Sequence, residues 1–331
     1  MRPTAAWLLA ASLAATPVCA QTQLVVITGL SGEPRYAEEF HAWATTLLEA
    51  ALNRWGLAES SVHYLAEATE RDPERIVARS TRENIEEILR ALAERVGPDE
   101  QIFIILIGHG TVRGEEARVN LPGPDMTAAN FAALLEAFPT QKIVFVNAAS
   151  ASGGFIEALS AGNRTVITAT RSASERNRTL FGRYFVEAFA GAGADVDKDD
   201  RVSALEAFSY AKREVARAYE AEGRLLTEHA LLDDNGDGEG SDEPQGDPDG
   251  SLARSVFMVG GLGAAAGREQ PADPRLAELY RDREELERQV AALRARKNEM
   301  DPEAYERQLE ATLIEIALKT RAIREVEEGV R

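Results

Sequence analysis

The stretch that decides the fold is IVFVNAASASGG, residues 143–154. Its first six residues, Ile143 to Ala148, show almost no polar alternation, which is typical of a strand that is buried on both faces. Small residues and two glycines follow at once, so the chain can turn sharply and lie close to another backbone. Ligands of open α/β sheets bind at the carboxyl ends of the strands, and the segment therefore predicts a site at residues 149–154.

Working outward, similar apolar runs alternate with helical patterns from residue 24 to about residue 184. The further predicted strands are 24–28, 61–65, 102–108 and 164–170, and the predicted helices are 37–55, 81–96, 127–138 and 204–223. Thr81 with Asn84, and Thr127 with Asn130, can begin two of these helices. The alternation predicts an α/β fold, a mostly parallel sheet covered on both faces. A further apolar run, 253–261, is expected to return to this sheet as an edge strand.

The amino terminus has the pattern of a secretory signal peptide over residues 1–20: one basic residue, an Ala/Leu-rich run, then Pro17 and a small-residue cleavage site. We therefore expect the protein to be exported, to the periplasm or outside the cell. The single cysteine, Cys19, lies in the segment that would be removed. The mature chain would then have no disulfide, no thiolate metal site and no thiol nucleophile.

The carboxyl terminus differs in composition from the rest of the chain. Residues 263–273 have the composition of a flexible linker after an α/β domain of residues 21–262. Residues 274–331 predict two antiparallel helices, with Asp301 as N-cap and Pro302 in the first turn of the second. The apolar seams of this coiled-coil-like hairpin are Leu276, Leu279, Leu286, Val290 and Leu293, and then Leu309, Leu313, Ile316 and Ile323. The hairpin would pack on the domain, pair with another chain, or stay partly exposed.

Charge and hydropathy limit the partners. The formal net charge of the 331 residues is −18, which disfavours nucleic acids and anionic lipids and suits cations. No apolar run after the signal segment approaches the roughly twenty residues that a membrane span needs.

A histidine between two glycines, in LIGHGT, ends the predicted strand 102–108. His109 is thus placed at the same edge as residues 149–154, where it could act as a base. Four segments carry a resemblance, namely LVVITGLSGEPRY (24–36), FIILIGHGT (103–111), VFVNAASASGGF (144–155) and VITATRSASERN (166–177). Their order and spacing resemble the legumain-type cysteine peptidases and, more distantly, the caspases, which share that fold. The resemblance covers roughly residues 24–229.

The resemblance implies a caspase/legumain-like three-layer sandwich with a catalytic Cys/His dyad, but Ser150 stands at the position of the cysteine. A hydroxyl is far less acidic than a thiol, so the same dyad activates it poorly. Loss of thiol peptidase activity is therefore expected. Two hypotheses remain: a pseudoenzyme that keeps the groove and binds peptide or protein, and a serine hydrolase that uses Ser150, or less favourably Ser152, with His109. A third is a structural protein that acts and self-associates through the hairpin.

The resemblance also suggests substrate-binding residues. Arg35 matches an arginine that lines the pocket for an acidic or amide side chain, and Ser174 and Glu175 lie where the family lines the same pocket. Glu175 could instead orient His109 or pair with Arg35. The backbone N–H groups of Gly108, Gly110 and Ser150 could form an oxyanion hole.

Two acidic stretches have the spacing of calcium loops, in which oxygen ligands alternate along twelve residues. The first, residues 195–206, offers Asp195, Asp197, Asp199, the Arg201 carbonyl, Ser203 and Glu206. Asp200 replaces the usual glycine where a left-handed turn is needed. The second, residues 233–244, offers Asp233, Asn235 and Asp237, but Pro244 stands where the last acidic ligand belongs. The sequence predicts structural Ca²⁺ binding at the first loop and a weaker site at the second.

Overall fold

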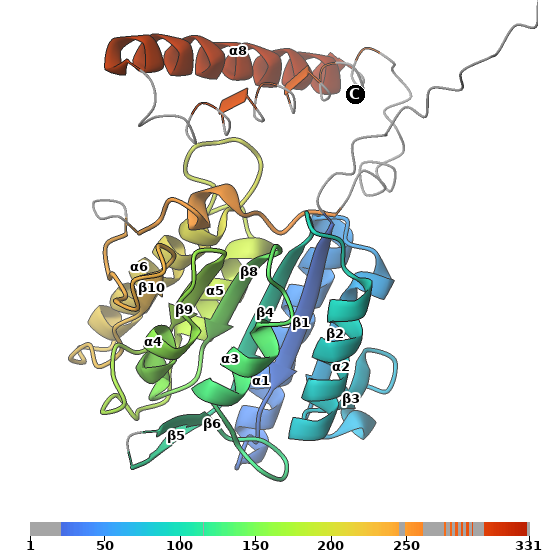
Figure 1. The fold of residues 1–331 in the computed structure, drawn as a ribbon, viewed down its shortest axis with the longest axis vertical. Helices are drawn as coiled ribbons and strands as arrows, with labels where there is room; N and C mark the ends of the chain where they lie inside the picture. Colours follow the sequence, from blue (N-terminus) through green and yellow to red (C-terminus); the bar gives the residue numbers. More distant parts are fainter. Residues whose placement is uncertain are drawn as a thin grey trace, which may run out of the picture.

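The computed structural model describes residues 21–260 except 115 and 245–248, single helical positions between 275 and 293, and residues 301–329. The predicted signal segment 1–20, the whole linker 263–273 and most of the first hairpin helix lie outside the described residues. Figure 1 shows the described chain as a sheet covered by helices, with the long helix α8 (Pro302–Gly329) in red.

A seven-stranded sheet forms the centre of the domain, with strand order β10-β9-β8-β4-β1-β2-β3 (Figure 1). Its strands are β1 (Thr22–Thr28), β2 (Val62–Ala66), β3 (Ile76–Arg79), β4 (Gln101–Ile107), β8 (Lys142–Asn147), β9 (Arg164–Thr168) and β10 (Leu231–Asp233). Every neighbouring pair is parallel except β9 and β10. The carboxyl ends of β1, β4, β8 and β9 therefore meet at one edge, as the sequence predicted.

Two apolar layers cover this sheet because alternate strand residues face opposite sides. Leu24, Phe103 and Val144 pack in one layer with α1 (Pro34–Glu49), α5 (Phe181–Ala190) and α6 (Ala204–Ala221). Their sequence neighbours pack in the other layer with α2 (Arg82–Arg95), α3 (Ala128–Leu135) and α4 (Phe155–Leu159). The predicted three-layer α/β sandwich is confirmed.

The predicted helix caps are present. The Thr81 hydroxyl accepts a hydrogen bond from the Asn84 N–H at 3.3 Å and begins α2. Thr127 and Asn130 form a reciprocal capping box at the start of α3. Asp301 accepts the Ala304 N–H at 3.0 Å and begins α8. Each cap satisfies N–H groups that the first helical turn leaves without a partner.

A second, three-stranded antiparallel sheet follows His109 directly and was not predicted. It consists of β5 (Gly110–Arg113), β6 (Glu116–Val119) and β7 (Met126–Thr127). Its return strand is anchored at the site edge, since the Asn120 N–H donates to the His109 carbonyl at 3.0 Å and the Leu30 N–H donates to the Asn120 carbonyl at 2.9 Å. The sheet thus connects the β1 and β4 loops.

The prediction of an edge strand at residues 253–261 is wrong. Residues 253–255 form a single 3-10 turn, and Phe257 makes only an isolated bridge to Ser203. The antiparallel edge is β10 instead, which pairs with β9. Its three residues are too few for an alternation pattern to identify.

Part of the predicted carboxyl-terminal hairpin can be compared with the structure. The described positions between 275 and 293 are helical, and Asp282 pairs with Lys319 of α8 at 2.5 Å. Leu313 and Leu318 are exposed on α8. Among the described helices, none is both long and apolar enough to cross a membrane.

Glu228 is a buried carboxyl that caps α5. Its oxygens accept N–H bonds from Leu180 (2.8 and 2.9 Å) and Phe181 (2.7 Å), and the residue is 4% exposed. Burial raises the pKa of Glu228 to about 7, although the N–H donors of Leu180 and Phe181 oppose this shift. The group therefore gains and loses its proton in the physiological range.

We predict a pH dependence from Glu228. Because its folded pKa lies above its ordinary value, its stabilising contribution is complete below about pH 4.5 and is lost as the pH rises through 7. Relative to Glu228→Gln, the wild-type free energy of unfolding should fall by up to about 3 kcal/mol between pH 4.5 and 7.5. Urea unfolding of both proteins across this range measures it, and parallel curves would contradict it.

We also predict that Gly153→Ala destabilises the fold. A Cβ at Gly153 would lie 2.3 Å from the Arg171 carbonyl carbon, so backbone must move. The expected loss is about 1–3 kcal/mol, measured by urea unfolding. Gly162→Ala is the matched control, because a Cβ there meets nothing within 4 Å. Equal stabilities of the two variants would show that the β8 and β9 loops are not packed as described.

Candidate functional site

Ser150 lies directly beyond β8 and is bonded to the backbone that follows His109. Its Oγ accepts the Gly110 N–H at 3.3 Å and donates to the Gly110 carbonyl at 3.2 Å. The residue is 5% exposed. The predicted meeting of the two loops is therefore correct, and the Ser150 proton is directed to a carbonyl oxygen.

The approach of these two loops leaves no room for a side chain. A Cβ at Gly110 would lie 2.1 Å from the Ser150 carbonyl oxygen. Gly110 was predicted to contact substrate and to supply an oxyanion-hole N–H, and here that N–H is bonded to Ser150. Ala151 follows with φ 55°, in the left-handed region that costs a residue with a side chain about 1 kcal/mol or more. The turn after Ser150 is thus strained as well as crowded.

Ser152, the second possible nucleophile, has a structural role. It is 1% exposed, and its Oγ lies 3.1 Å from the Thr170 hydroxyl and accepts the Thr170 N–H at 3.1 Å. The Ser152 N–H also donates to Thr170 Oγ1 at 2.8 Å. These bonds join the β8 and β9 loops.

The His109 imidazole packs against the first turns of α1. Its ring meets Tyr36 edge-on at a centroid distance of 4.9 Å and Phe40 at 5.2 Å. Burial lowers its pKa, partly opposed by a backbone hydrogen bond to Ser31, and the Arg178 charge lowers it further. The ring is therefore neutral at pH 7.

Tyr36 lies between His109 and two arginines. Arg35 stacks over the Tyr36 ring at 4.5 Å and pairs with Glu33 at 2.9 Å. Arg178 lies over the same ring at 5.6 Å and pairs with Glu39 at 2.6 Å. Arg35 and His109 thus contact the same tyrosine ring, the substrate-binding role of Arg35 stays a prediction, and Arg178 is a further cation that the sequence did not indicate.

Glu175 neither orients His109 nor pairs with Arg35. Its Oε1 lies 2.6 Å from Nδ1 of His229 and 3.3 Å from Arg171 Nε. His229 precedes β10, so the carboxylate connects the β9 loop to the edge strand. Position along the chain could not reveal this partner, because it comes 54 residues later. The Glu175 carbonyl also accepts the Ala151 N–H at 2.8 Å.

Ser174 is exposed on the same loop and lies 2.7 Å, Oγ to Oγ, from Ser172. Its predicted role in substrate binding stays a prediction. The same holds for the catalytic roles of His109 and Ser150.

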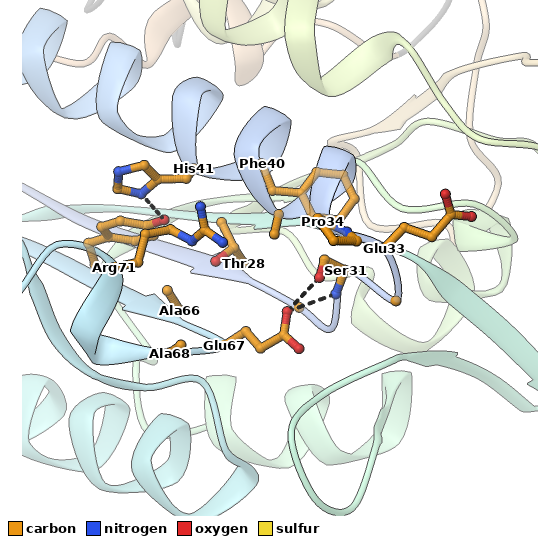
Figure 2. A pocket seen from close by; sticks show the side chains of 14 residues that line it. Thr28, Ser31, Glu33, Pro34, Phe40, His41, Ala66, Glu67, Ala68 and Arg71 are labelled. Carbon is orange, nitrogen blue, oxygen red and sulfur yellow. Dashed lines mark hydrogen bonds between the residues drawn. The ribbon is translucent and has the colours of Figure 1, made fainter.

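A cavity of about 380 Å³ opens at the carboxyl ends of β1 and β2 (Figure 2). The sequence did not predict it. Its walls come from the β1–α1 loop, the first turns of α1 and the segment after β2, and they include Thr28, Phe40, His41, Tyr64, Glu67 and Arg71. Phe40 is also a ring neighbour of His109, so the cavity adjoins the His109 side of the sheet edge.

The first acidic loop brings three carboxylates together. Ligand oxygens of Asp195, Asp197 and Asp199 lie within 4.8 Å of one another. Burial, together with the charges of Asp199 and Glu206, raises the pKa of Asp197 to about 6. Asp200 adopts φ 64°, the left-handed turn that the loop requires. The arrangement could hold a cation with oxygen ligands.

The other predicted ligands of this loop have protein partners. Glu206 accepts N–H bonds from Val196 and Ser203, each at 2.9 Å, and forms a capping box with Ser203 at the start of α6. The Arg201 guanidinium pairs with Asp199 at 2.8 Å.

The second acidic loop begins with a buried carboxylate, Asp233. Asp233 is 1% exposed, and its Oδ1 accepts the Gly236 N–H at 3.3 Å. Asn235 and Asp237 bond to each other at 2.9 Å. Calcium binding at both loops stays a prediction.

Comparison with known proteins agrees with part of the resemblance. Residues 82–228 match the model of the Peptidase C13 family, a segment that contains His109 and Ser150 but not Arg35. No curated protein matches the chain. The solved structure of drICE is 10% identical with a TM-score of 0.38, covering 62% of this chain and 86% of that one. Raptor of Chaetomium thermophilum is 10% identical with a TM-score of 0.35, covering 52% of this chain and 18% of that one. Over residues 82–228, this protein is therefore similar to the Peptidase C13 family.

Proposed function

We propose that this protein is a peptide-binding relative of the C13 peptidases that does not cleave peptide bonds. The observation that carries the proposal is the bonding of Ser150. Its hydroxyl exchanges two hydrogen bonds with the backbone of Gly110. A serine nucleophile instead needs its proton directed to a base, and the His109 ring packs against Tyr36 and Phe40.

The surroundings of His109 favour an acidic or amide side chain in the bound peptide. Arg35 and Arg178 both lie over Tyr36, whose ring meets that of His109. Guanidinium groups donate paired hydrogen bonds to carboxylates and single ones to amide oxygens. Each arginine has a surface carboxylate partner, Glu33 or Glu39, which a bound acidic group would partly displace.

We further propose that the protein is exported and that the acidic loops bind structural Ca²⁺. The signal-like segment 1–20 and the loop spacing of 195–206 support this. A bound divalent cation would relieve the repulsion among Asp195, Asp197 and Asp199, and calcium outside the cytoplasm is abundant enough for sites of about millimolar affinity.

The lack of hydrolysis can be tested with a fluorophosphonate probe, which labels activated serines. We expect wild type and Ser150→Ala to be equally unlabelled, and neither to release amine from peptide amides. Label on wild type that Ser150→Ala and His109→Ala both lose would instead establish the serine hydrolase. Chymotrypsin in the same reaction is the positive control for the probe.

Peptide binding can be tested by fluorescence anisotropy with the labelled peptides Ala-Ala-Asp-Ala and Ala-Ala-Lys-Ala, both amidated. We expect the Asp peptide to bind more tightly, and the double variant Arg35→Ala/Arg178→Ala to lose about tenfold in affinity for it. Arg183→Ala is the matched control, because Arg183 also stacks on a tyrosine and pairs with a glutamate, on α5. Equal affinities for both peptides, or an equal loss in the control, would contradict the proposal.

Calcium binding predicts a thermal shift. Saturating CaCl2 should raise Tm by roughly 5 °C relative to EDTA, and MgCl2 should have a smaller effect. Asp197→Asn should abolish most of the shift, whereas Asp99→Asn, exposed and outside both acidic loops, should retain it. A Tm that is unchanged by calcium would exclude the structural role.

A further inference from the structure

The cavity of Figure 2 is separate from the bonds that hold Ser150. The cavity lies at the carboxyl ends of β1 and β2. Ser150 instead follows β8, and the sheet order β8-β4-β1-β2 places β8 three strands from β2. His109 and Ser150 do not line it. Its volume of about 380 Å³ is sufficient for a group of the size of one amino acid.

Arg71 is the cation of this cavity. Its guanidinium lies at the cavity wall in Figure 2, and its charge lowers the pKa of both His41 and Tyr64, which places it close to these two side chains. Among the described residues, no hydrogen bond or ion pair of the Arg71 side chain is found. The neighbouring Arg75, in contrast, pairs with Glu49 at 3.1 Å and with Asp72 at 3.4 Å.

The other polar groups of the wall are neutral, or are carboxylates that already have partners, such as Glu33, which pairs with Arg35 at 2.9 Å. His41 Nδ1 lies 3.1 Å from the Tyr64 hydroxyl, and burial lowers the pKa of His41 and raises that of Tyr64 to about 12. Both are therefore uncharged at pH 7, and the second ring nitrogen of His41, Nε2, lies 3.7 Å from Asp72 Oδ2. Glu67 accepts bonds from the Ser31 N–H at 3.1 Å and the Ser31 hydroxyl at 2.7 Å.

We propose that this cavity binds a carboxylate through Arg71, with His41 and Tyr64 as neutral hydrogen-bonding neighbours. A planar guanidinium in a concave site matches a carboxylate in two parallel bonds. A phosphate group is disfavoured, because one cation would face its two charges beside the Glu33 and Glu67 carboxylates. The carboxylate belongs either to the side chain of an acidic residue or to the carboxyl terminus of a peptide. The proposal is independent of whether the Ser150 edge binds peptide.

The test is calorimetric titration of the full chain with three small ligands. N-acetyl-aspartate amide carries only a side-chain carboxylate, N-acetyl-alanine carries only a terminal one, and N-acetyl-alanine amide carries neither. We expect at least one of the first two to bind with an affinity of about millimolar or better, and the third not to bind. The ligand that binds more tightly identifies the source of the carboxylate.

Arg71→Ala should weaken this binding by about tenfold or more, with no change in Tm, because the side chain bonds to none of the described residues. Arg75→Ala removes the same charge on the next turn outside the cavity and should change the affinity less than about threefold. Arg178→Ala, whose partner Glu39 does not line the cavity, should retain the binding, which separates this cavity from the arginines at Tyr36. The proposal is overturned if neither carboxylate binds wild type, or if Arg71→Ala and Arg75→Ala have equal effects.

Discussion

The close approach of the β4 and β8 loops is the constraint on which the site depends. The Gly110 backbone lies against the Ser150 carbonyl with no space for a Cβ, and the Ser150 hydroxyl bonds to both polar groups of Gly110. A similar approach joins Gly153 to the Arg171 backbone. Three strand ends are thereby held together through backbone contacts, and the small sheet β5-β6-β7 must begin directly at this junction.

At this junction, an oxygen in Ser150 in place of a cysteine sulfur has different chemical properties. A thiol is a weak hydrogen-bond donor and acceptor, and as a thiolate it is a strong nucleophile. A hydroxyl at the same place bonds well to a peptide group and ionises poorly. The Ser150 hydroxyl therefore stabilises the turn. In the family that the sequence resembles, a cysteine at this position supplies the nucleophile. Ala151, with φ 55°, follows directly in this strained turn.

Three arginines lie around the first turns of α1 on a strongly acidic protein, and two of them pair with carboxylates there. Arg35 belongs to this helix, Arg178 pairs with Glu39 on it, and Arg71 lines the cavity whose wall includes Pro34 and Ala37. The helix amino terminus adds the positive end of its dipole. In both proposals these arginines bind the acidic groups of a ligand, although the chain as a whole carries a net charge of −18.

The sequence by itself determined the elements with strong periodicity and local signals. The buried strands around residues 24–28, 102–108 and 143–148, the caps of α2 and α3, and the left-handed Asp200 follow from residue type and spacing within a few positions. The common edge of His109 and Ser150 also followed, because parallel strands align their carboxyl ends.

Only the tertiary structure decided which side chains face one another at that edge. The pairing of Glu175 with His229, the packing of His109 on Tyr36 and Phe40, and the cavity at Arg71 each join segments that are distant in sequence. The short strands β3 and β10 depend on sheet neighbours and carry no pattern of their own. The physical reason is that periodicity specifies the face a residue occupies, whereas its partner is set by how separate loops pack and by which buried polar groups remain to be satisfied.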